Sequence, residues 1–119
     1  MSTLVCGSIA FDTTMKFPER FKDYIIADQI HDISVCFVSP EMRREFGGAA
    51  GNIAYNLKLL GEEPLLMGTV GHDFKEYRNW LGKCGIIDTF VREIPGLFTA
   101  QCVITTDRDN NQLTSFHPG

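Results

Sequence analysis

The chain has little of what marks a nucleic-acid-binding, membrane-spanning or secreted protein. Its 119 residues carry 11 basic and 15 acidic side chains, a formal net charge of −4, and no run of lysine or arginine. A phosphate backbone is bound by a concentrated basic surface, so we expect no nucleic-acid partner. No apolar stretch approaches the roughly 18 residues that span a bilayer, and no leader pattern opens the chain. We therefore expect a cytoplasmic protein with no membrane partner.

The cysteines also lack the patterns of a metal or redox site. There are four, with no CxxC pair and no zinc-type spacing to histidine. We expect them to be reduced thiols buried as small apolar side chains, and we expect no metal site among them. The remaining composition, 44% hydrophobic and 22% charged residues, is typical of one globular domain.

The apolar patterns that are present predict an α/β fold. Continuous apolar runs indicate buried strands, whereas apolar residues at three-and-four spacing indicate helices. Gly61 and Gly85 stand where helix-ending glycines belong, and Asp73 is placed to cap the second helix. The predicted elements, in order, are a strand at 3–9, a helix at 50–60, a strand at 64–70, a helix at 74–84, strands at 86–94 and 99–106, a turn at 107–111 and a strand at 112–116.

The segment 15–46 has a different character. Aromatic and β-branched residues alternate with polar ones, no helical stripe is sustained, and Pro18 and Pro40 interrupt the stretch. This pattern predicts strands of a separate, partly exposed sheet, one of them at 34–39.

A glycine cluster, residues 47–52 (GGAAGN), precedes the first predicted helix. Its small residues let a ligand approach the backbone, and its N–H groups can bind an electronegative group. The GxGxxG spacing of dinucleotide-binding loops is absent, and no GK[ST] follows as in a Walker A loop. The residues alone leave two interpretations, a binding loop or a structural turn.

The spacing around this cluster resembles a known signature. Two glycines, a small pair, Gly51, then Asn-Ile-Ala, six residues to Gly61 and nine more to Gly71 match the first signature of the ribokinase-like (PfkB-type) carbohydrate kinases. Residues 7–12 (GSIAFD) resemble the first strand and substrate aspartate of that family, and 70–74 (VGHDF) its next conserved block. More narrowly, segments 15–21, 77–81 and 99–119 resemble bacterial adenosine kinases.

The resemblance implies a particular architecture. Residues 1–119 would be the amino-terminal, substrate-binding part of one kinase domain, an α/β sheet with helices on both faces. A small β lid would fold over the substrate, with strands from 15–46 joined by the hairpin near 99–116. The catalytic aspartate of the family lies in a carboxyl-terminal G-A-G-D motif, which this sequence lacks. We therefore expect the ATP and Mg²⁺ sites to lie outside this chain and the chain alone to be inactive.

The resemblance also implies a set of site residues. Asp12 would accept hydrogen bonds from ribose hydroxyls, Asn52 would contact another hydroxyl, and Phe116 would stack on the base. Taken singly, each has a simpler interpretation, as a surface aspartate, a helix cap and a core aromatic residue. Phe37 and Phe46 are further aromatic candidates. The implied substrate-binding residues are Ser8, Asp12, Cys36, Gly47, Gly48, Asn52, Cys102 and Phe116.

The implied function is transfer of a phosphoryl group from ATP to the 5′-hydroxyl of adenosine. Cys36 and Cys102 stand where adenosine kinases carry a serine and an aromatic residue, so another nucleoside or a sugar stays open as the substrate. A second possibility is a non-catalytic fragment that associates through its lid strands, for example as a homodimer. The adjacent His72 and Asp73 invite an acid–base interpretation, but helix capping by Asp73 is the simpler one.

Overall fold

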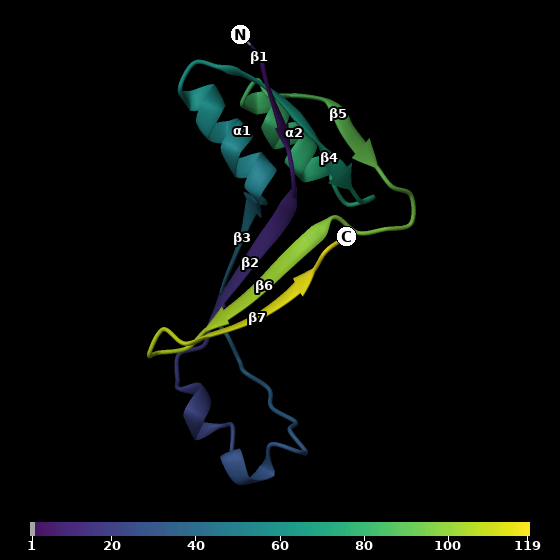
Figure 1. Ribbon diagram of the computed structural model, residues 1–119. Coiled ribbons are helices and arrows are strands. Elements are labelled where there is room, and N and C mark those ends of the chain that lie inside the picture. Colours follow the sequence, from purple (N-terminus) through teal and green to yellow (C-terminus); the bar gives the residue numbers. More distant parts are fainter. Residues whose placement is uncertain (1) are drawn as a thin grey trace.

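The structure is a computed structural model that describes residues 2–119, and it contains two β-sheets (Figure 1). The first sheet is parallel and has the strand order β1-β4-β5. Its strands are β1 (Ser2–Cys6), β4 (Glu63–Val70) and β5 (Ile87–Glu93). Only the central strand is largely an apolar run, whereas charged and apolar residues are mixed in β5.

Two helices, α1 (Ala49–Leu59) and α2 (Lys75–Lys83), pack on the first sheet. Inward side chains from all three strands form one core with both helices, so the helices cover the same face. Gly61 and Gly85 adopt φ values of 85° and 69°, which confirms them as helix-ending glycines. In each case the amide of the glycine and that of the residue after it donate back to carbonyls of the last helical turn, the pattern of a Schellman motif.

The other face of the first sheet is open within residues 2–119. Leu4, Met67 and Phe90 on this face are between 40% and 55% exposed. The resemblance implies helices on both faces, whereas the described residues supply them on one.

The second sheet has the order β3-β2-β6-β7, with β2 and β6 parallel and the other pairs antiparallel. It extends away from the helices and gives the molecule an elongated shape of 57 × 32 × 21 Å (Figure 1). The radius of gyration is 17.6 Å, against about 13.5 Å for a compact domain of this length. The strands are β2 (Ala10–Lys16), β3 (Glu41–Gly47), β6 (Ala100–Thr106) and β7 (Gln112–His117).

The prediction of a strand at 34–39 is wrong. Between β2 and β3 the chain forms two short 3₁₀ helices, Phe21–Asp23 and Ala27–Gln29, and then an irregular segment. Exposed and half-buried residues do alternate along 34–39, but this segment has no partner strand. Phe37 instead packs against Phe17 and Phe21, with ring centroids 4.8 Å apart in both pairs.

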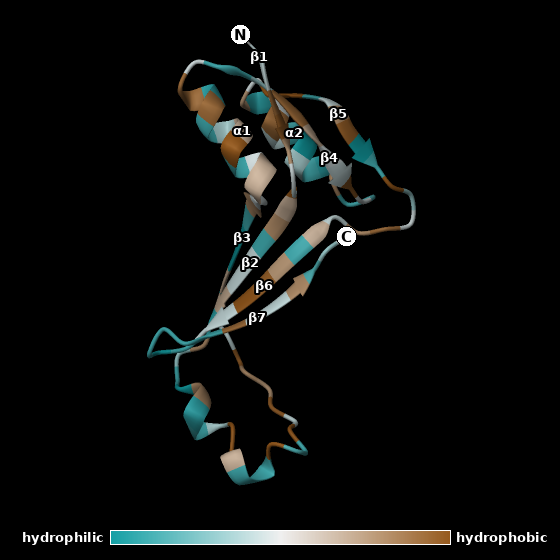
Figure 2. Ribbon diagram, in the orientation of Figure 1, coloured by the Kyte–Doolittle hydropathy of each residue, from teal (hydrophilic) through white to brown (hydrophobic). Residues whose placement is uncertain are grey.

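The turn at 107–111 is confirmed, and it is hydrophilic throughout (Figure 2). Its organising residue is the buried Asp107. The Asp107 carboxylate accepts hydrogen bonds from the amides of Asp109 and Asn111, each at 2.9 Å, and from the Phe21 amide at 3.0 Å. The turn is therefore tied to the first 3₁₀ helix.

Asp73 does not cap α2. The residue at the cap position is Phe74, and no side chain bonds the first turn there. The Asp73 carboxylate accepts hydrogen bonds from the Thr99 amide at 2.8 Å and from Gln101 Nε2 at 3.2 Å. His72 Nδ1 lies 2.7 Å from the Leu97 carbonyl oxygen. Both residues thus connect the end of β4 to the start of β6 and link the two sheets.

The four cysteines are free, but the expectation that all are buried is wrong. Cys6 and Cys36 are exposed, while Cys84 and Cys102 are partly buried. Cys6 belongs to the sheet whose second face is open, and Cys36 lies in the irregular segment before β3. None of the helices in residues 2–119 has the length and apolar character to cross a membrane.

Candidate functional site

The strand register of the second sheet gathers several predicted site residues into one row. Asp12 in β2 lies opposite Glu45 in β3 and Cys102 in β6, and Cys102 lies opposite Phe116 in β7. Residues directly opposite one another project from the same face of a sheet. The row therefore places two carboxylates, a thiol and an aromatic ring side by side.

The Asp12 carboxylate lies against the backbone of the glycine cluster. A Cβ atom at Gly47 would overlap Asp12 Oδ2, so a larger residue there would displace the carboxylate from its present position. Burial, and secondarily the negative charge of Glu45, raise the pKa of Asp12 above its ordinary value. Like charges directly opposite each other are unfavourable in a sheet. This pair of carboxylates can gain from hydroxyl donors supplied by a ligand.

Ser8 and Gly48 build the turn that begins α1. Gly48 has φ 87°, and a Cβ atom there would lie 2.5 Å from the Ser8 carbonyl oxygen. Ser8 Oγ accepts the Ala49 amide at 2.9 Å, and the Ser8 carbonyl accepts the Ala50 amide at 3.0 Å. Two first-turn amides of α1 are therefore satisfied internally, which leaves less capacity for anion binding than the sequence suggests.

Asn52 is exposed in the first turn of α1, and the cap position belongs to Gly48. Its backbone carbonyl accepts Asn56 Nδ2 at 2.8 Å. Within residues 2–119 the Asn52 side chain has no hydrogen-bond partner, so its amide is available to a ligand with both a donor and an acceptor.

Tyr77 lies beneath the glycine cluster, although the sequence predicted for it a helix and a kinase-like segment but no role in the site. It is fully buried, and its hydroxyl donates to the Gly47 carbonyl at 2.7 Å. Burial, and then the charge of Asp12, raise the pKa of Tyr77 to about 12. The signal in the sequence was a polar-tipped aromatic residue on the inner face of a helix, which normally finds a hydrogen-bond partner when buried.

Not every predicted residue joins this site. Cys36 lies beyond the far end of the second sheet, in the segment that hangs away from the helices in Figure 1. Phe37 packs in the aromatic cluster at that end, and Phe46 stacks on Trp80 with centroids 5.1 Å apart. Neither ring is directed at the Asp12 row.

Phe116 is 59% exposed and lines a cavity of about 530 Å³. Its neighbours Gln101, Val103 and Ser115 are offset by one residue from the Asp12 row. Because side chains alternate along a strand, these three project from the opposite face. Those three lining residues thus lie on the face opposite the Asp12 carboxylate, while Phe116 belongs by register to the Asp12 row and lines the cavity from the edge strand β7.

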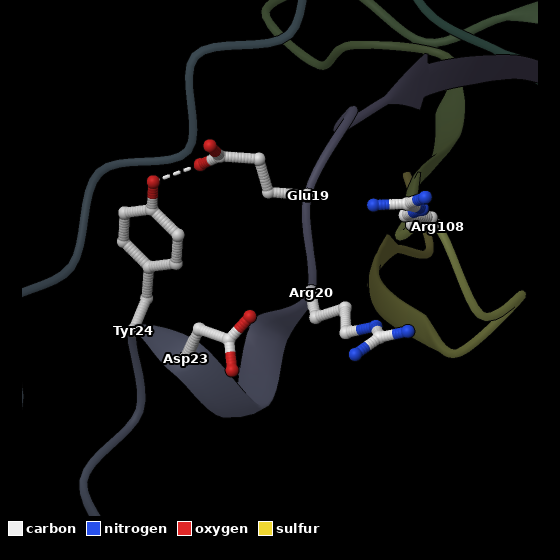
Figure 3. A pocket seen from close by; sticks show the side chains of 5 residues that line it. All are labelled: Glu19, Arg20, Asp23, Tyr24 and Arg108. Carbon is white, nitrogen blue, oxygen red and sulfur yellow. Dashed lines mark hydrogen bonds between the residues drawn. The ribbon is translucent and has the colours of Figure 1, made fainter.

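A second cavity, of about 320 Å³, lies at the far end and is lined by charged groups (Figure 3). The Tyr24 hydroxyl donates to Glu19, and Arg20 pairs with Asp109 at 3.2 Å. The Arg108 guanidinium also faces the cavity. None of the predicted site residues lines it. Residues 2–119 contain no group of three His, Cys, Asp or Glu side chains that could hold a metal ion.

Comparison with known proteins agrees with the resemblance to PfkB-type kinases, whereas the narrower resemblance to adenosine kinases stays a prediction, because the relatives are named nucleoside kinases. The model of the pfkB family of carbohydrate kinases matches residues 23–119, which is most of the chain. A nucleoside kinase of Methanothermobacter thermautotrophicus is 34% identical over 100 residues, covering 82% of this chain and 32% of the relative. The chain spans about a third of the length of such curated relatives.

Solved structures give the same result. A Burkholderia thailandensis nucleoside kinase in complex with inosine is 48% identical over all of this chain and 37% of its own, with a TM-score of 0.79. It was also solved with ADP-inosine. The Methanocaldococcus jannaschii nucleoside kinase is 30% identical, with a TM-score of 0.82 over 98% of this chain and 36% of its own. The chain belongs to the PfkB family of carbohydrate kinases.

Proposed function

We propose that the chain is the nucleoside-binding part of an ATP-dependent purine nucleoside kinase, with adenosine as the first candidate substrate. The observation that carries the proposal is the position of the Asp12 carboxylate against Gly47, at the start of the helix that presents the unpartnered Asn52 side chain. An ionised carboxylate can accept hydrogen bonds from two vicinal hydroxyls, and an amide can serve a third group. A ribose ring offers these groups together.

The internal capping of α1 supports a hydroxyl ligand at this position. Ser8 already accepts the hydrogen bonds of the Ala49 and Ala50 amides, so these two amides fix the turn and are not free to bind a phosphate. The nearby negative charges of Asp12 and Glu45 would repel a phosphate. The sugar end of a nucleoside fits this environment better than its phosphorylated product does.

The reaction would pass the γ-phosphoryl group of ATP to the 5′-hydroxyl of the bound nucleoside. Such transfer depends on positioning and on stabilisation of charge. The residues of this chain would bind the ribose and orient its 5′-hydroxyl. The base that takes the hydroxyl proton, the ATP site and the Mg²⁺ site are expected outside this chain, since the G-A-G-D motif is absent from it.

The identity of the base is a separate choice. Segments 15–21, 77–81 and 99–119 favour adenosine, while the relative solved with inosine favours a purine nucleoside more broadly. Cys102 and Phe116, next to Asp12 in the row, are the residues that we assign to the base. Another nucleoside or a sugar remains the alternative substrate.

Isothermal titration of the chain with adenosine, inosine and ribose tests the proposal. We expect purine nucleosides to bind more tightly than ribose. Asp12→Asn should weaken binding about ten- to a hundredfold, because a charge-assisted hydrogen bond contributes about 1.5–3 kcal/mol. Asp28→Asn, which changes an exposed carboxylate of the second 3₁₀ helix, is the matched control and should bind as the wild type does. Equal affinities for the two variants would overturn the assignment of Asp12.

A second candidate function is association through the far end of the second sheet. Register places Met42, Met15, Thr105 and Leu113 in one row, and Met42 and Leu113 are 66% and 44% exposed. Exposed apolar side chains beside the free edges of β3 and β7 favour pairing with a second copy. Sedimentation of the wild type beside Met42→Lys would show a concentration-dependent dimer that the variant lacks.

A further inference from the structure

Tyr77 was not among the predicted site residues, yet its hydroxyl occupies an unusual place. The residue is fully buried in α2, yet its polar tip reaches the last residue of β3, where it donates to the Gly47 carbonyl at 2.7 Å. A buried hydroxyl that kept no partner would cost about 1–3 kcal/mol, so this contact is expected to persist. It joins the helix core to the glycine cluster.

The ring of Tyr77 has almost no freedom to move. Four aromatic rings surround it, with centroids between 4.9 and 5.7 Å from its own. Gly51 closes the remaining side, because a Cβ atom there would overlap the hydroxyl oxygen. The surrounding rings are those of Phe11, Phe46, Phe74 and Trp80. A ring held so tightly fixes the position of its hydroxyl and of the carbonyl that the hydroxyl binds.

Gly47 in turn lies against the Asp12 carboxylate, where a Cβ atom would not fit. A shift of Gly47 by a fraction of an ångström would therefore change the space beside the carboxylate. The contacts run without a gap from the Tyr77 hydroxyl through the Gly47 peptide to Asp12.

We propose that Tyr77 is a positioning residue of the nucleoside site, whose hydroxyl holds the Gly47 peptide against Asp12 and so orients the carboxylate toward the sugar. The proposal rests on the proposed function for the identity of the ligand. The coupling between Tyr77, Gly47 and Asp12 is independent of the proposed function, because it can be measured without a ligand.

The first test compares Tyr77→Phe with Leu81→Val. Both change fully buried residues of α2, but only the first removes the hydroxyl. We expect Tyr77→Phe to weaken nucleoside binding about tenfold, the effect of one hydrogen bond of about 1.4 kcal/mol. Leu81→Val should lower the unfolding midpoint and leave the affinity of the folded chain unchanged. Equal affinities in the two variants would overturn the proposal.

The second test needs no nucleoside and follows the Asp12 carboxyl by carbon-13 NMR as pH changes. The ionisable groups that face Asp12 are Glu45 and Cys102, directly opposite it in β3 and β6, Arg43, two residues from Glu45 on the same face of β3, and Tyr77 from α2. If Tyr77 keeps Gly47 against the carboxylate, Tyr77→Phe admits water and moves the pKa of Asp12 down toward its ordinary value. The titration should be unmoved in Leu81→Val. An unmoved titration in Tyr77→Phe contradicts the proposal even where nucleoside binding is weak.

A third variant, Gly51→Ala, tests the same contact from α1 and leaves the Tyr77 hydroxyl in place. Gly51→Ala places a Cβ atom on the hydroxyl oxygen, whereas the next ring atom, Cζ, would be 3.3 Å away. Gly51→Ala should therefore disturb the Asp12 titration while the Tyr77 hydroxyl is present. The Gly51→Ala, Tyr77→Phe double variant lacks that hydroxyl, so it should be more stable than Gly51→Ala alone. Strictly additive destabilisation would reject the coupling. Absence of nucleoside binding by the wild type would reject the proposed function and leave these ligand-free measurements to decide on Tyr77.

Discussion

The two ends of the second sheet are stabilised in different ways. At the end near α1, Phe11 and Phe46 join the main core, with the Phe46 ring 4.9 Å from that of Tyr77 and 5.1 Å from that of Trp80. At the far end, Phe17 and Phe21 stack on each other, centroids 5.9 Å apart, and form a cluster of their own with Tyr24 and Phe37. No helix of the main core reaches that cluster (Figure 1).

The two ends of the second sheet are therefore expected to differ in local stability. The near end holds the Asp12 carboxylate and shares its packing with both helices, so its geometry should persist as long as the chain is folded. The far end depends on a small cluster and on the hydrogen bonds of Asp107, so it should open at lower free energy than the rest. Such a loosely held end is what the predicted lid would need in order to admit a ligand and then cover it.

The largest expected effect comes from the junction that joins the sheets. A Cβ atom at Gly71 would overlap the backbone of Leu97, Phe98 and Thr99, none of which can rotate away. Gly71→Ala should destabilise the chain by about 4 kcal/mol or prevent folding. Gly82→Ala, the matched control, meets nothing within 4 Å in an exposed helical position and should stabilise the chain by about 0.5–1 kcal/mol. Urea denaturation measures both, and similar midpoints would show that the junction does not hold the sheets together.

A smaller effect distinguishes the two aromatic clusters. Phe46→Ala removes a ring from the main core and should cost about 3 kcal/mol in global unfolding free energy. Phe37→Ala removes a ring of similar partial burial at the far end and should cost roughly half as much, because the far cluster contributes less to the cooperative core. Hydrogen exchange should rise throughout the chain in the first variant and only near residues 17–37 in the second. Equal global losses would mean that the two ends fold as one unit.

The same contrast explains what could be predicted from the sequence. The strands and helices of the first sheet, both helix-ending glycines and the hairpin of β6 and β7 follow from apolar period and turn residues, although β1 ends at Cys6, three residues before the predicted end. The prediction of a strand at 34–39 was wrong because alternation of polar and apolar residues indicates only that one side of a segment is buried. Here an aromatic cluster buries Phe37 without any partner strand. Local pattern cannot reveal whether a neighbouring strand exists.

The candidate site divides in a similar way. The glycine cluster and Asp12 were found through spacing, and the structure brings them together. Tyr77 was missed as a site residue because its contact with Gly47 spans 30 residues of sequence. Asp73 was assigned to the wrong partner for the same reason, since Thr99, which it binds, lies 26 residues away.

The smallest expected effect is a difference in pH dependence between Asp12 at the near end and Asp107 at the far end. Burial favours the neutral form of Asp107, but the amides of Phe21 and Asn111 and the Asn111 side chain outweigh it and lower the pKa of the carboxyl. A lowered pKa in the folded state means that Asp107 stabilises the chain above the ordinary carboxyl pKa of about 3.9, and that this stabilisation is lost as pH falls below it. Asp12 has a raised pKa and the opposite sign, so its ionised form opposes folding at neutral pH, and protonation relieves this as pH falls.

Thermal unfolding between pH 7 and pH 3 should separate the two. Asp107→Asn should lower the midpoint at pH 7 and reduce its decline in acid. Asp12→Asn should slightly raise the midpoint at pH 7, and this gain should vanish at low pH, where the wild-type carboxyl is itself neutral. A stabilising Asp12→Asn that also loses nucleoside binding would identify Asp12 as a group kept for the ligand at a cost to the fold. A destabilising one would mean that the carboxylate has a structural partner at neutral pH and that the near end is built around it.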